Sequence, residues 1–515
     1  MVSPSYPGVY ISEVPSQTMI QGASTSVAAF VGATHSGPVD TPTLVTSWNE
    51  FTRTFGGLGW SSFTAWAVYG FFASGGAICY VVRSSDGNGA AARATVGAFE
   101  VTASGPGVWG NALSVSLSGE GPTTSLDVLV ETSLLQADDA GLSARRMAQF
   151  ARRNGCPTVA HDGKDYTVLE SHALDGGSGA LAAAKVTDTS MFVRVESLEA
   201  ALAEDSREAT LSGGTEPDGD VSKSVRTLDE FHDISLLALP DAPLTVDGDG
   251  KADSAAHGAL IRDALDYCQE SQRLFLVVAS PSGLDVDEVL HFRQGRYGPG
   301  AKPLDSGFGA LYYPWVWQLH PTTSRALLVP ADGMVLGRYA ATDTNVGVYK
   351  APAGVTDGQL QLASGFETDV TDEQGQRLNP EGVNALRTMP GYGEVIWGAR
   401  TLSRELDWVY VNVRRLVLYV EQSIRQSMQW VAFESNDERT RARLHADVSS
   451  FLTGLWQEGA LWGTKASDAF FVTVDENNNP PQTRAQGVLI LDVGIAPVRP
   501  AEFVVLRFSQ QTQIS

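Results

Sequence analysis

The chain is poor in cysteine and in long apolar runs, and each shortage excludes a class of protein. Only three cysteines occur in 515 residues, Cys79, Cys156 and Cys268, and none belongs to a CxxC pair. This pattern predicts a reducing compartment and no disulfide framework. No apolar run reaches the roughly 18 residues needed to span a bilayer. The first residues also lack the basic and apolar stretches of a secretory signal peptide, so we expect no direct membrane insertion.

Basic residues are also scarce. The chain has 36 Lys and Arg against 59 Asp and Glu, a net charge of −23. This balance argues against a nucleic-acid backbone or an anionic membrane as the main partner. The acidity is explained either by a basic protein partner or by solubility alone. Hydrophobic content of 43% and charged content of 18% are typical of a globular chain with a sizeable core, and the length allows about three or four domains.

The N-terminal segment contains a short strand without an evident partner. Val9, Tyr10 and Ile11 form an apolar, partly β-branched run between Pro7 and Pro15. The N–H and C=O groups of a strand need hydrogen-bond partners, yet no hairpin turn follows this one.

The last residues repeat this situation. Phe503 and Val505 point to one side of a predicted strand, and Val504 and Leu506 point to the other. Apolar residues on both faces indicate burial on both faces. The predicted strands at both ends of the sequence therefore need partner strands in a sheet. Either each chain lends its strands to a neighbouring chain, which is β-augmentation, or the two ends pair within one chain.

Between the termini the pattern changes several times. Residues 27–31 and 43–45 read as strands, and Ser47 and Glu50 form a capping-box pattern at the start of a helix. Residues 86–225 are rich in small and polar residues with short strands such as 126–130, which predicts an inserted surface domain.

An α/β pattern begins near residue 226. Apolar strands at 234–240 and 273–281 enclose a helical stretch at 261–270, and this order predicts a parallel βαβ unit. The spacing at 408–433 predicts a long amphipathic helix, followed by another helix near 448–462.

Several stretches resemble one family in combination and in order. They are YPGVYISEV, VAAFVGATHSGPVDTP, DISLLALP, LYYPWVWQ, VPADGMVLGRYAATDTNVGVYKAPAG, VYVNVRRLVLYVEQSI and IAPVRPAEFVV. The chain resembles the tail-sheath proteins of contractile phage tails and contractile injection systems over most of its length except about 96–205. Where the family usually reads PPSG, this chain has VPADG at 329–333, a departure that falls in a loop.

The resemblance implies a multi-domain α/β fold with extended terminal strands. It comprises an α+β inner core domain, a subtilisin-like α/β middle domain without a catalytic site, and an inserted β-rich outer domain. The expected boundaries are 1–20 for the N-terminal linker strand, 21–95 and 378–500 for the two parts of the inner core, 96–225 for the outer insertion, 226–377 for the α/β sheath domain, and 501–515 for the C-terminal linker strand.

The resemblance also implies a structural role. The chain would be a subunit of a contractile helical sheath of stacked, six-fold rings around an inner tube, with baseplate and terminal cap proteins as further partners. It would assemble in the cytoplasm of the producing cell as part of a phage tail or injection-system particle. Contraction would use energy stored on assembly, with no cofactor and no metal. The expected inter-subunit strand residues are Val9, Tyr10, Ile11, Phe503, Val504, Val505 and Leu506.

The surface that faces the tube is predicted from charge. A tube contact that must later release suits polar and charged residues better than a large apolar interface. Glu458 and Asp468 are acidic residues between the expected apolar anchors Leu455 and Trp462. We therefore expect Glu458, Asp468 or both to face a basic patch on the tube.

Two other functions compete with the sheath hypothesis. One is a static shell or tube protein that never contracts. The other is a serine protease, because the middle domain of the family is subtilisin-like. His232, His257, His291 and His320 lie there, but no G-x-S-x-G motif accompanies them, so we expect no catalytic site.

Other motifs have simpler explanations. No GxxxxGK[ST] loop accompanies LSGGTEPDGD, and the acidic run 475–479 lacks the glycine and final glutamate of a calcium loop, so both read as turns. A set of tryptophans reads mostly as core: Trp315, Trp317, Trp397, Trp408, Trp456 and Trp462.

Overall fold

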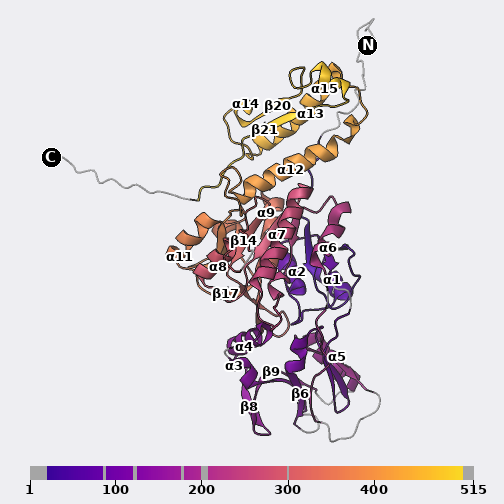
Figure 1. The fold of residues 1–515 in the computed structure, drawn as a ribbon, viewed down its shortest axis with the longest axis vertical. Coiled ribbons are helices and arrows are strands. Elements are labelled where there is room, and N and C mark those ends of the chain that lie inside the picture. The colour runs from indigo at the N-terminus through magenta and orange to yellow at the C-terminus, as the bar shows by residue number, and fades with distance from the viewer. Residues whose placement is uncertain are drawn as a thin grey trace, which may run out of the picture. The chain divides into compact units, whose positions relative to one another are not determined.

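The computed structural model describes residues 20–84, 88–119, 124–137, 139–174, 179–198, 207–217, 219–298 and 301–502. The chain divides into two compact units (Figure 1). The smaller unit comprises residues 1–23 and 419–499, and the larger unit comprises 24–418 and 500–515. The boundary falls inside helix α12 (Val411–Ser427).

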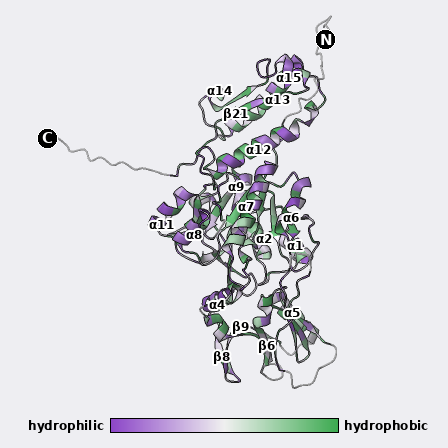
Figure 2. Ribbon diagram, viewed as in Figure 1, coloured by the Kyte–Doolittle hydropathy of each residue, from purple (hydrophilic) through white to green (hydrophobic). Residues whose placement is uncertain are grey.

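An eight-stranded sheet forms the centre of the larger unit, in the order β19-β18-β14-β13-β12-β1-β3-β2. Its six inner strands are parallel, and the edge strands β2 and β19 are antiparallel to their neighbours. Every residue of β1, β13 and β14 is buried, as the apolar runs at 27–31 and 273–281 predicted for the first two. Figure 2 shows that hydrophobic residues gather around α2 and α7 in the larger unit. The strands are β1 Ala28–Gly32, β2 Thr43–Val45, β3 Cys79–Arg83, β12 Leu236–Ala238, β13 Phe275–Ala279, β14 Gly309–Tyr313, β18 Val383–Met389 and β19 Gly393–Trp397.

This sheet joins segments that the resemblance assigned to different domains. The resemblance separated 21–95 and 378–500 from the α/β segment 226–377. In the structure β1 is hydrogen-bonded to β12, and β18 is hydrogen-bonded to β14, so strands from all three segments share one sheet. Parallel strands are joined by long crossovers, so their order in the sequence does not reveal which strands pair.

The predicted βαβ unit is present. Helix α7 (Ser254–Ser271) connects β12 to β13, and the two strands pair in parallel. The helix begins seven residues earlier than the sequence suggested, because the Asp253 carboxylate accepts hydrogen bonds from the Ala255 and Ala256 N–H groups at 2.9 Å and so forms its N-cap.

Helix α1 (Trp48–Phe55) confirms one half of the expected capping box. The Ser47 hydroxyl accepts from the Glu50 N–H at 3.3 Å, as an N-cap residue does. The Glu50 carboxylate, however, accepts from the N–H and hydroxyl of Thr46 at 2.9 and 2.8 Å rather than from Ser47. The N-cap was therefore predicted correctly, and the reciprocal bond is displaced by one residue.

Two helices approach each other closely through glycine. Gly333 and Gly337 lie one turn apart on α9 (Asp332–Asn345), facing α2 (Thr64–Ala73). A Cβ atom on Gly333 would lie 2.2 Å from the Ala67 carbonyl oxygen, and one on Gly337 would lie 2.5 Å from that of Phe71. Only glycine allows this approach.

A buried ion pair ties α12 to α9. Arg415 donates through Nη1 and Nη2 to the two carboxylate oxygens of Asp343 at 3.0 and 2.5 Å, and Nη2 also reaches the Thr25 carbonyl at 2.9 Å. Both partners are almost wholly buried. The guanidinium lies 4.8 Å from the ring centre of Tyr339, which adds a cation–π contact.

The inserted segment forms two antiparallel sheets of its own, ordered β10-β5-β4 and β11-β6-β7-β9-β8. Neither contains a strand of the central sheet. Their strands are β4 Arg93–Val96, β5 Phe99–Ala103, β6 Leu113–Ser118, β7 Ser125–Glu131, β8 Thr158–His161, β9 Lys164–Ala173, β10 Val193–Ser197 and β11 Glu208–Thr210. The helices of this segment are α3 Thr132–Gln136, α4 Leu142–Asn154 and α5 Gly179–Thr189.

The insertion packs against Trp60, a buried residue of the preceding segment. The Trp60 ring stacks on Phe192 at 4.7 Å and meets Phe150 edge-on at 6.0 Å. Arg146 lies 4.5 Å from the Trp60 ring and donates to its carbonyl oxygen at 3.0 Å. These contacts make the insertion part of a continuous core with the larger unit.

The remaining elements of the larger unit surround the sheet. A three-stranded sheet contains β15 Val316–Leu319, β16 Ala326–Val329 and β17 Ala363–Phe366. The other helices are α6 Val221–Arg226, α8 Val286–Arg293, α10 Gly354–Asp357 and α11 Asp372–Leu378.

The smaller unit contains the end of α12 and a helix–sheet arrangement. The helix expected at 408–433 is α12, which ends at Ser427. The helix expected at 448–462 begins earlier, at Glu438, because Asp437 accepts from the Thr440 N–H at 2.9 Å and forms its N-cap. The other elements are α13 Glu438–Gln457, α14 Ala466–Ala469, β20 Phe470–Thr473, α15 Pro481–Ala485 and β21 Asp492–Ile495.

Candidate functional site

The smaller unit contains a sheet of only two strands, β20 and β21. They pair antiparallel, with Phe470 opposite Ile495 and Val472 opposite Val493. Within the described ranges, no third strand joins β20 or β21, and Leu461 forms an isolated bridge with Pro497 just beyond the end of β21. A two-stranded sheet alone is marginally stable in water, so open edges of this kind invite further strands.

The register shows which main-chain groups point outward. The Ala496 N–H donates to the Ala469 carbonyl at 2.8 Å, one step beyond the ladder. In an antiparallel pair, hydrogen-bonded and non-hydrogen-bonded residue pairs alternate. Phe470 and Val472 therefore direct their N–H and C=O groups away from β21, and Val493 and Ile495 direct theirs away from β20. Each edge offers two residues to an added strand.

Exposed aromatic side chains accompany this sheet. Phe471 is 61% exposed and lies across Gly494, where a Cβ atom would come 2.1 Å from its ring. The Trp462 side chain is 70% exposed, and the main-chain N–H of this residue donates to the Ala496 carbonyl at 2.8 Å. Large aromatic side chains at the surface beside unpaired strand edges are typical of a protein–protein contact.

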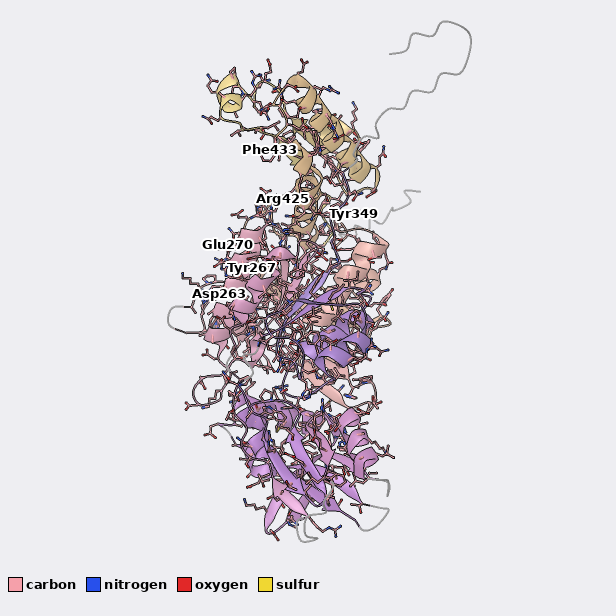
Figure 3. The ribbon with its side chains drawn as sticks, turned by 90° about the vertical axis from the view of Figure 1, so that its right-hand side faces the viewer. Asp263, Tyr267, Glu270, Tyr349, Arg425 and Phe433 are labelled. Atoms are coloured by element: carbon pink, nitrogen blue, oxygen red, sulfur yellow. The ribbon has the colours of Figure 1, made fainter. Side chains whose placement is uncertain are left out.

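A third exposed aromatic residue of the smaller unit lies between α12 and α13. Phe433 is fully exposed and has a φ of 73° (Figure 3). A bulky residue in the left-handed region costs about 1 kcal/mol or more, so this conformation is held by the surrounding loop rather than by the residue itself.

The seven predicted strand residues lie outside the described residues, so their pairing stays a prediction. The residues that follow the expected N-terminal linker are described, however. In the smaller unit, the N–H groups of Gln21 and Ala23 donate to the hydroxyls of Ser427 and Ser423 at 3.1 and 2.9 Å. Gly22 leaves no room for a side chain, because a Cβ atom there would lie 2.3 Å from the Tyr419 hydroxyl. The residues that directly follow the N-terminal linker are thus fixed along α12.

The start of the C-terminal segment is fixed in the larger unit. Arg400 donates through Nε to both Glu502 carboxylate oxygens at 3.1 Å and through Nη2 to Oε2 at 2.5 Å. Both side chains are mostly buried, and the pair raises the pKa of Arg400. Glu502 immediately precedes the predicted C-terminal strand. Neither anchor was predicted. The partners are 102 residues apart in this anchor, and 400 and 406 residues apart in the N-terminal one, so no local pattern connects them.

The predicted tube-facing residues both lie at the surface of the smaller unit. Glu458 is exposed at the C-terminal end of α13. Asp468 is exposed on α14 and accepts from the Thr464 hydroxyl at 3.4 Å. Of the two expected anchors, Leu455 is buried but Trp462 is not.

The tryptophan prediction was partly wrong. Trp315 is buried, as expected, but Trp397 is 45% exposed and Trp462 is 70% exposed. Both exposed residues lie outside the central core, at the end of an edge strand or in a loop, where periodicity does not show which side is covered.

Two of the four histidines that were weighed for the protease alternative, His257 and His320, are buried. His257 is buried against Phe292 with a ring separation of 5.1 Å, and burial lowers its pKa to about 3. His320 accepts through Nδ1 from the Thr322 and Thr323 N–H groups at 3.2 and 3.3 Å, and burial lowers its pKa.

The run 475–479 forms the predicted turn, in which Asp475 accepts from the Asn477 N–H at 2.7 Å.

Acidic residues gather at a hollow of about 330 Å³ on α7. Asp263, Tyr267 and Glu270 lie along this helix and line the hollow (Figure 3). Arg226 also lines this hollow, and its guanidinium lies 3.4 Å from the Glu270 carboxylate, so part of the negative charge is already paired within the protein.

Across the described ranges, no group of three or more metal-ligating side chains occurs. None of the described helices has the length and apolarity to cross a membrane.

The fold is similar to that of solved contractile sheath proteins. It matches the sheath protein in the contracted helical sheath of the anti-feeding prophage, with a TM-score of 0.57 and 24% identity over 99% of this chain and 100% of that chain. The chain thus has the fold of a contractile sheath subunit, and residues 404–511 match the phage tail sheath C-terminal domain family.

Curated relatives agree with this class. The tail sheath protein of Vibrio phage KVP40 is 26% identical over 193 residues, 37% of this chain and 28% of the relative. That of Enterobacteria phage T4 is 23% identical over 313 residues, 58% of this chain and 46% of the relative. The chain therefore spans about a quarter to a half of the length of these relatives. The chain is similar to the contractile tail-sheath proteins, which confirms the resemblance seen in its sequence.

Proposed function

We propose that this chain is the structural subunit of a contractile helical sheath around an inner tube, in a phage tail or an injection-system particle. The observation that carries the proposal is the fold match to a contracted sheath protein over nearly the full length of both chains. The family match at residues 404–511 supports it independently. The sheath would assemble in the producing cell as stacked six-fold rings, with the tube, baseplate and terminal cap proteins as partners.

The open sheet of the smaller unit is the acceptor in this proposal. The strand at Val9–Ile11 of one neighbour and the strand at Phe503–Leu506 of another would add to its two edges and make four strands. Each added main-chain hydrogen bond is worth about 0.5–1.5 kcal/mol net. Each buried valine, isoleucine or leucine side chain adds about 1.5–3 kcal/mol. This is enough to link subunits while the rest of each subunit moves.

Contraction in this proposal is a change between two discrete subunit packings. The exchanged strands keep neighbouring subunits connected, and the anchors at Ala23 and Glu502 fix where each tether leaves its unit. Energy is stored when the extended sheath assembles on the tube, and no nucleotide is consumed.

Substitutions in the N-terminal strand test the exchange. Val9→Asp with Ile11→Asp places charges where apolar burial is expected, and Ser3→Asp with Ser5→Asp is the matched control outside the strand. The first pair, like deletion of residues 1–15, should give folded subunits that form no connected rods in electron micrographs, while the control forms them. Rods from the strand variant that assemble and contract intact would contradict the exchange.

Rod dimensions test contraction itself. Wild-type particles should show two populations, one long and narrow and one short and wide. A single length and width under all conditions would favour the static shell.

The tube contact has its own test. Glu458→Lys with Asp468→Lys should weaken templating on the tube at low salt without lowering the melting temperature of the subunit. Raised salt should partly reproduce the effect in the wild type, because exposed charges are screened over about 8–10 Å. Unaltered co-assembly of the double variant with the tube at low salt would exclude these residues.

A further inference from the structure

Four arginines line one hollow in the larger unit. The hollow has a volume of about 530 Å³, and Arg293, Arg296, Arg400 and Arg404 contribute to its wall. Glu381 is the one acidic residue among the lining residues. This concentration of positive charge stands out in a chain whose net charge is −23.

Arg293 is buried at the base of this group. It is the last residue of α8 and only 1% exposed. Its Nε donates to the Glu381 carbonyl at 3.0 Å and its Nη2 to the Leu402 carbonyl at 2.6 Å. Its Nη1 is buried and has no hydrogen-bond partner among the described residues. A buried guanidinium with a donor to spare is costly unless an acceptor reaches it.

The electrostatic surroundings of Arg293 add to this cost. Burial lowers its pKa to about 10, and the positive charge of Arg404 acts in the same direction. Asp305 and Glu381 offset only part of the effect. An added anion would relieve both the desolvation and the repulsion between the two guanidiniums.

The other three arginines differ in how far their guanidiniums are already paired with carboxylates. Arg296 and Arg404 are exposed, and within the described part of the chain no carboxylate lies within 4.0 Å of either guanidinium. Asp305 meets Arg404 only through the main-chain N–H, at 3.1 Å. Arg400 is occupied by Glu502.

We propose that this hollow binds a small multivalent oxyanion of the phosphate or pyrophosphate type. The planar guanidinium fork matches the oxygens of such a group, and several guanidiniums converge here. The anion accepts from the exposed guanidiniums of Arg296 and Arg404, and the buried positive charge of Arg293 in the wall of the hollow attracts it further. A compact anion suits a hollow of about 530 Å³ better than an extended acidic peptide does.

The site is coupled to the anchor of the C-terminal segment. An anion in the hollow competes with the Glu502 carboxylate for Arg400, so its binding loosens the Arg400–Glu502 pair. Only this consequence rests on the proposed function, in which the segment after Glu502 is exchanged between subunits.

Calorimetric titration of the purified full chain with pyrophosphate, at constant ionic strength, tests the site. Arg296→Gln with Arg404→Gln removes two exposed guanidiniums that form no ion pair and donate no hydrogen bond among the described residues, and should weaken binding about tenfold or more. Arg145→Gln with Arg152→Gln removes the same charge from the exposed face of α4 and should leave the affinity within about twofold of wild type.

A second variant tests the competition. Glu502→Gln frees Arg400 and should tighten pyrophosphate binding several-fold, whereas Glu270→Gln, which removes an acidic charge elsewhere, should not. Absence of binding, or equal weakening by the two arginine pairs, would overturn the site. An unchanged affinity of Glu502→Gln would overturn the competition, and binding of a poly-glutamate peptide in place of pyrophosphate would overturn the choice of ligand. These titrations use unassembled subunits, so their outcome is independent of whether a sheath forms.

Discussion

Replacement of His257 by phenylalanine should change how the stability of this protein depends on pH. His257 lies on α7, is 2% exposed, and has both ring nitrogens buried without a partner among the described residues. Its ring packs 5.1 Å from that of Phe292, so another aromatic ring fits the surroundings. Burial lowers the pKa of His257 from 6.5 to about 3.

The expected magnitude follows from proton linkage. Between about pH 6.5 and pH 3 the unfolded chain binds a proton at this histidine and the folded chain does not. The wild type therefore loses stability as the pH falls through this range, by up to about 1.36 kcal/mol per pH unit. At pH 5 the loss is about 2 kcal/mol relative to neutral pH, and His257→Phe removes it.

Urea denaturation of both proteins at pH 7.5 and pH 5.0 measures this effect. The variant should gain about 2 kcal/mol relative to the wild type on going to pH 5.0. Other groups titrate in both proteins and cancel in the difference. Among them is Asp332, whose pKa burial raises to about 7, so that its own contribution to stability falls as the pH rises from 3.8 to 7. A difference in unfolding free energy that is the same at the two pH values would refute the assigned burial of a neutral His257.

Three further changes probe the packing. Gly333→Ala should lower the free energy of unfolding in urea by about 1–3 kcal/mol, because its Cβ would meet the Ala67 carbonyl. Gly375→Ala on α11 has open space around it and should not destabilise the protein. Equal losses would contradict the close α2–α9 contact. Arg415→Ala should lower the free energy of unfolding by about 3–5 kcal/mol, because it leaves Asp343 buried and unpaired. The double replacement Arg415→Met with Asp343→Leu should lower it less than this single change. A single change without effect would show that the pair is not buried in solution. The insertion was expected at 96–225, with about 100–205 removable. In the structure it should be removable by joining Ala90 to Thr215, whose main chains already share a 2.9 Å hydrogen bond. That shortened chain should still assemble, with a lower melting temperature because Trp60 loses its cover, and an insoluble or non-assembling product would count against an outer location.

Local patterns in the sequence determined the elements well. Continuous apolar runs predicted the buried parallel strands at β1, β12 and β13, since a strand covered on both faces needs no polar side. Ser47 marked the start of α1, and the 3.6-residue spacing marked α12, although its end was misplaced by several residues. These signals are local, because caps and periodicity depend on residues within one or two turns.

The tertiary structure alone decided which of these elements meet. It placed β1 between β3 and β12, which the chain order does not suggest, because a parallel pairing spans any number of intervening residues. It left Trp462 exposed and β20–β21 as an open pair, since burial depends on what covers a residue and not on its own side chain. It also brought Arg293, Arg400 and Glu502 together from positions up to 209 residues apart, where no sequence spacing connects them and only the closing of the chain supplies the contact.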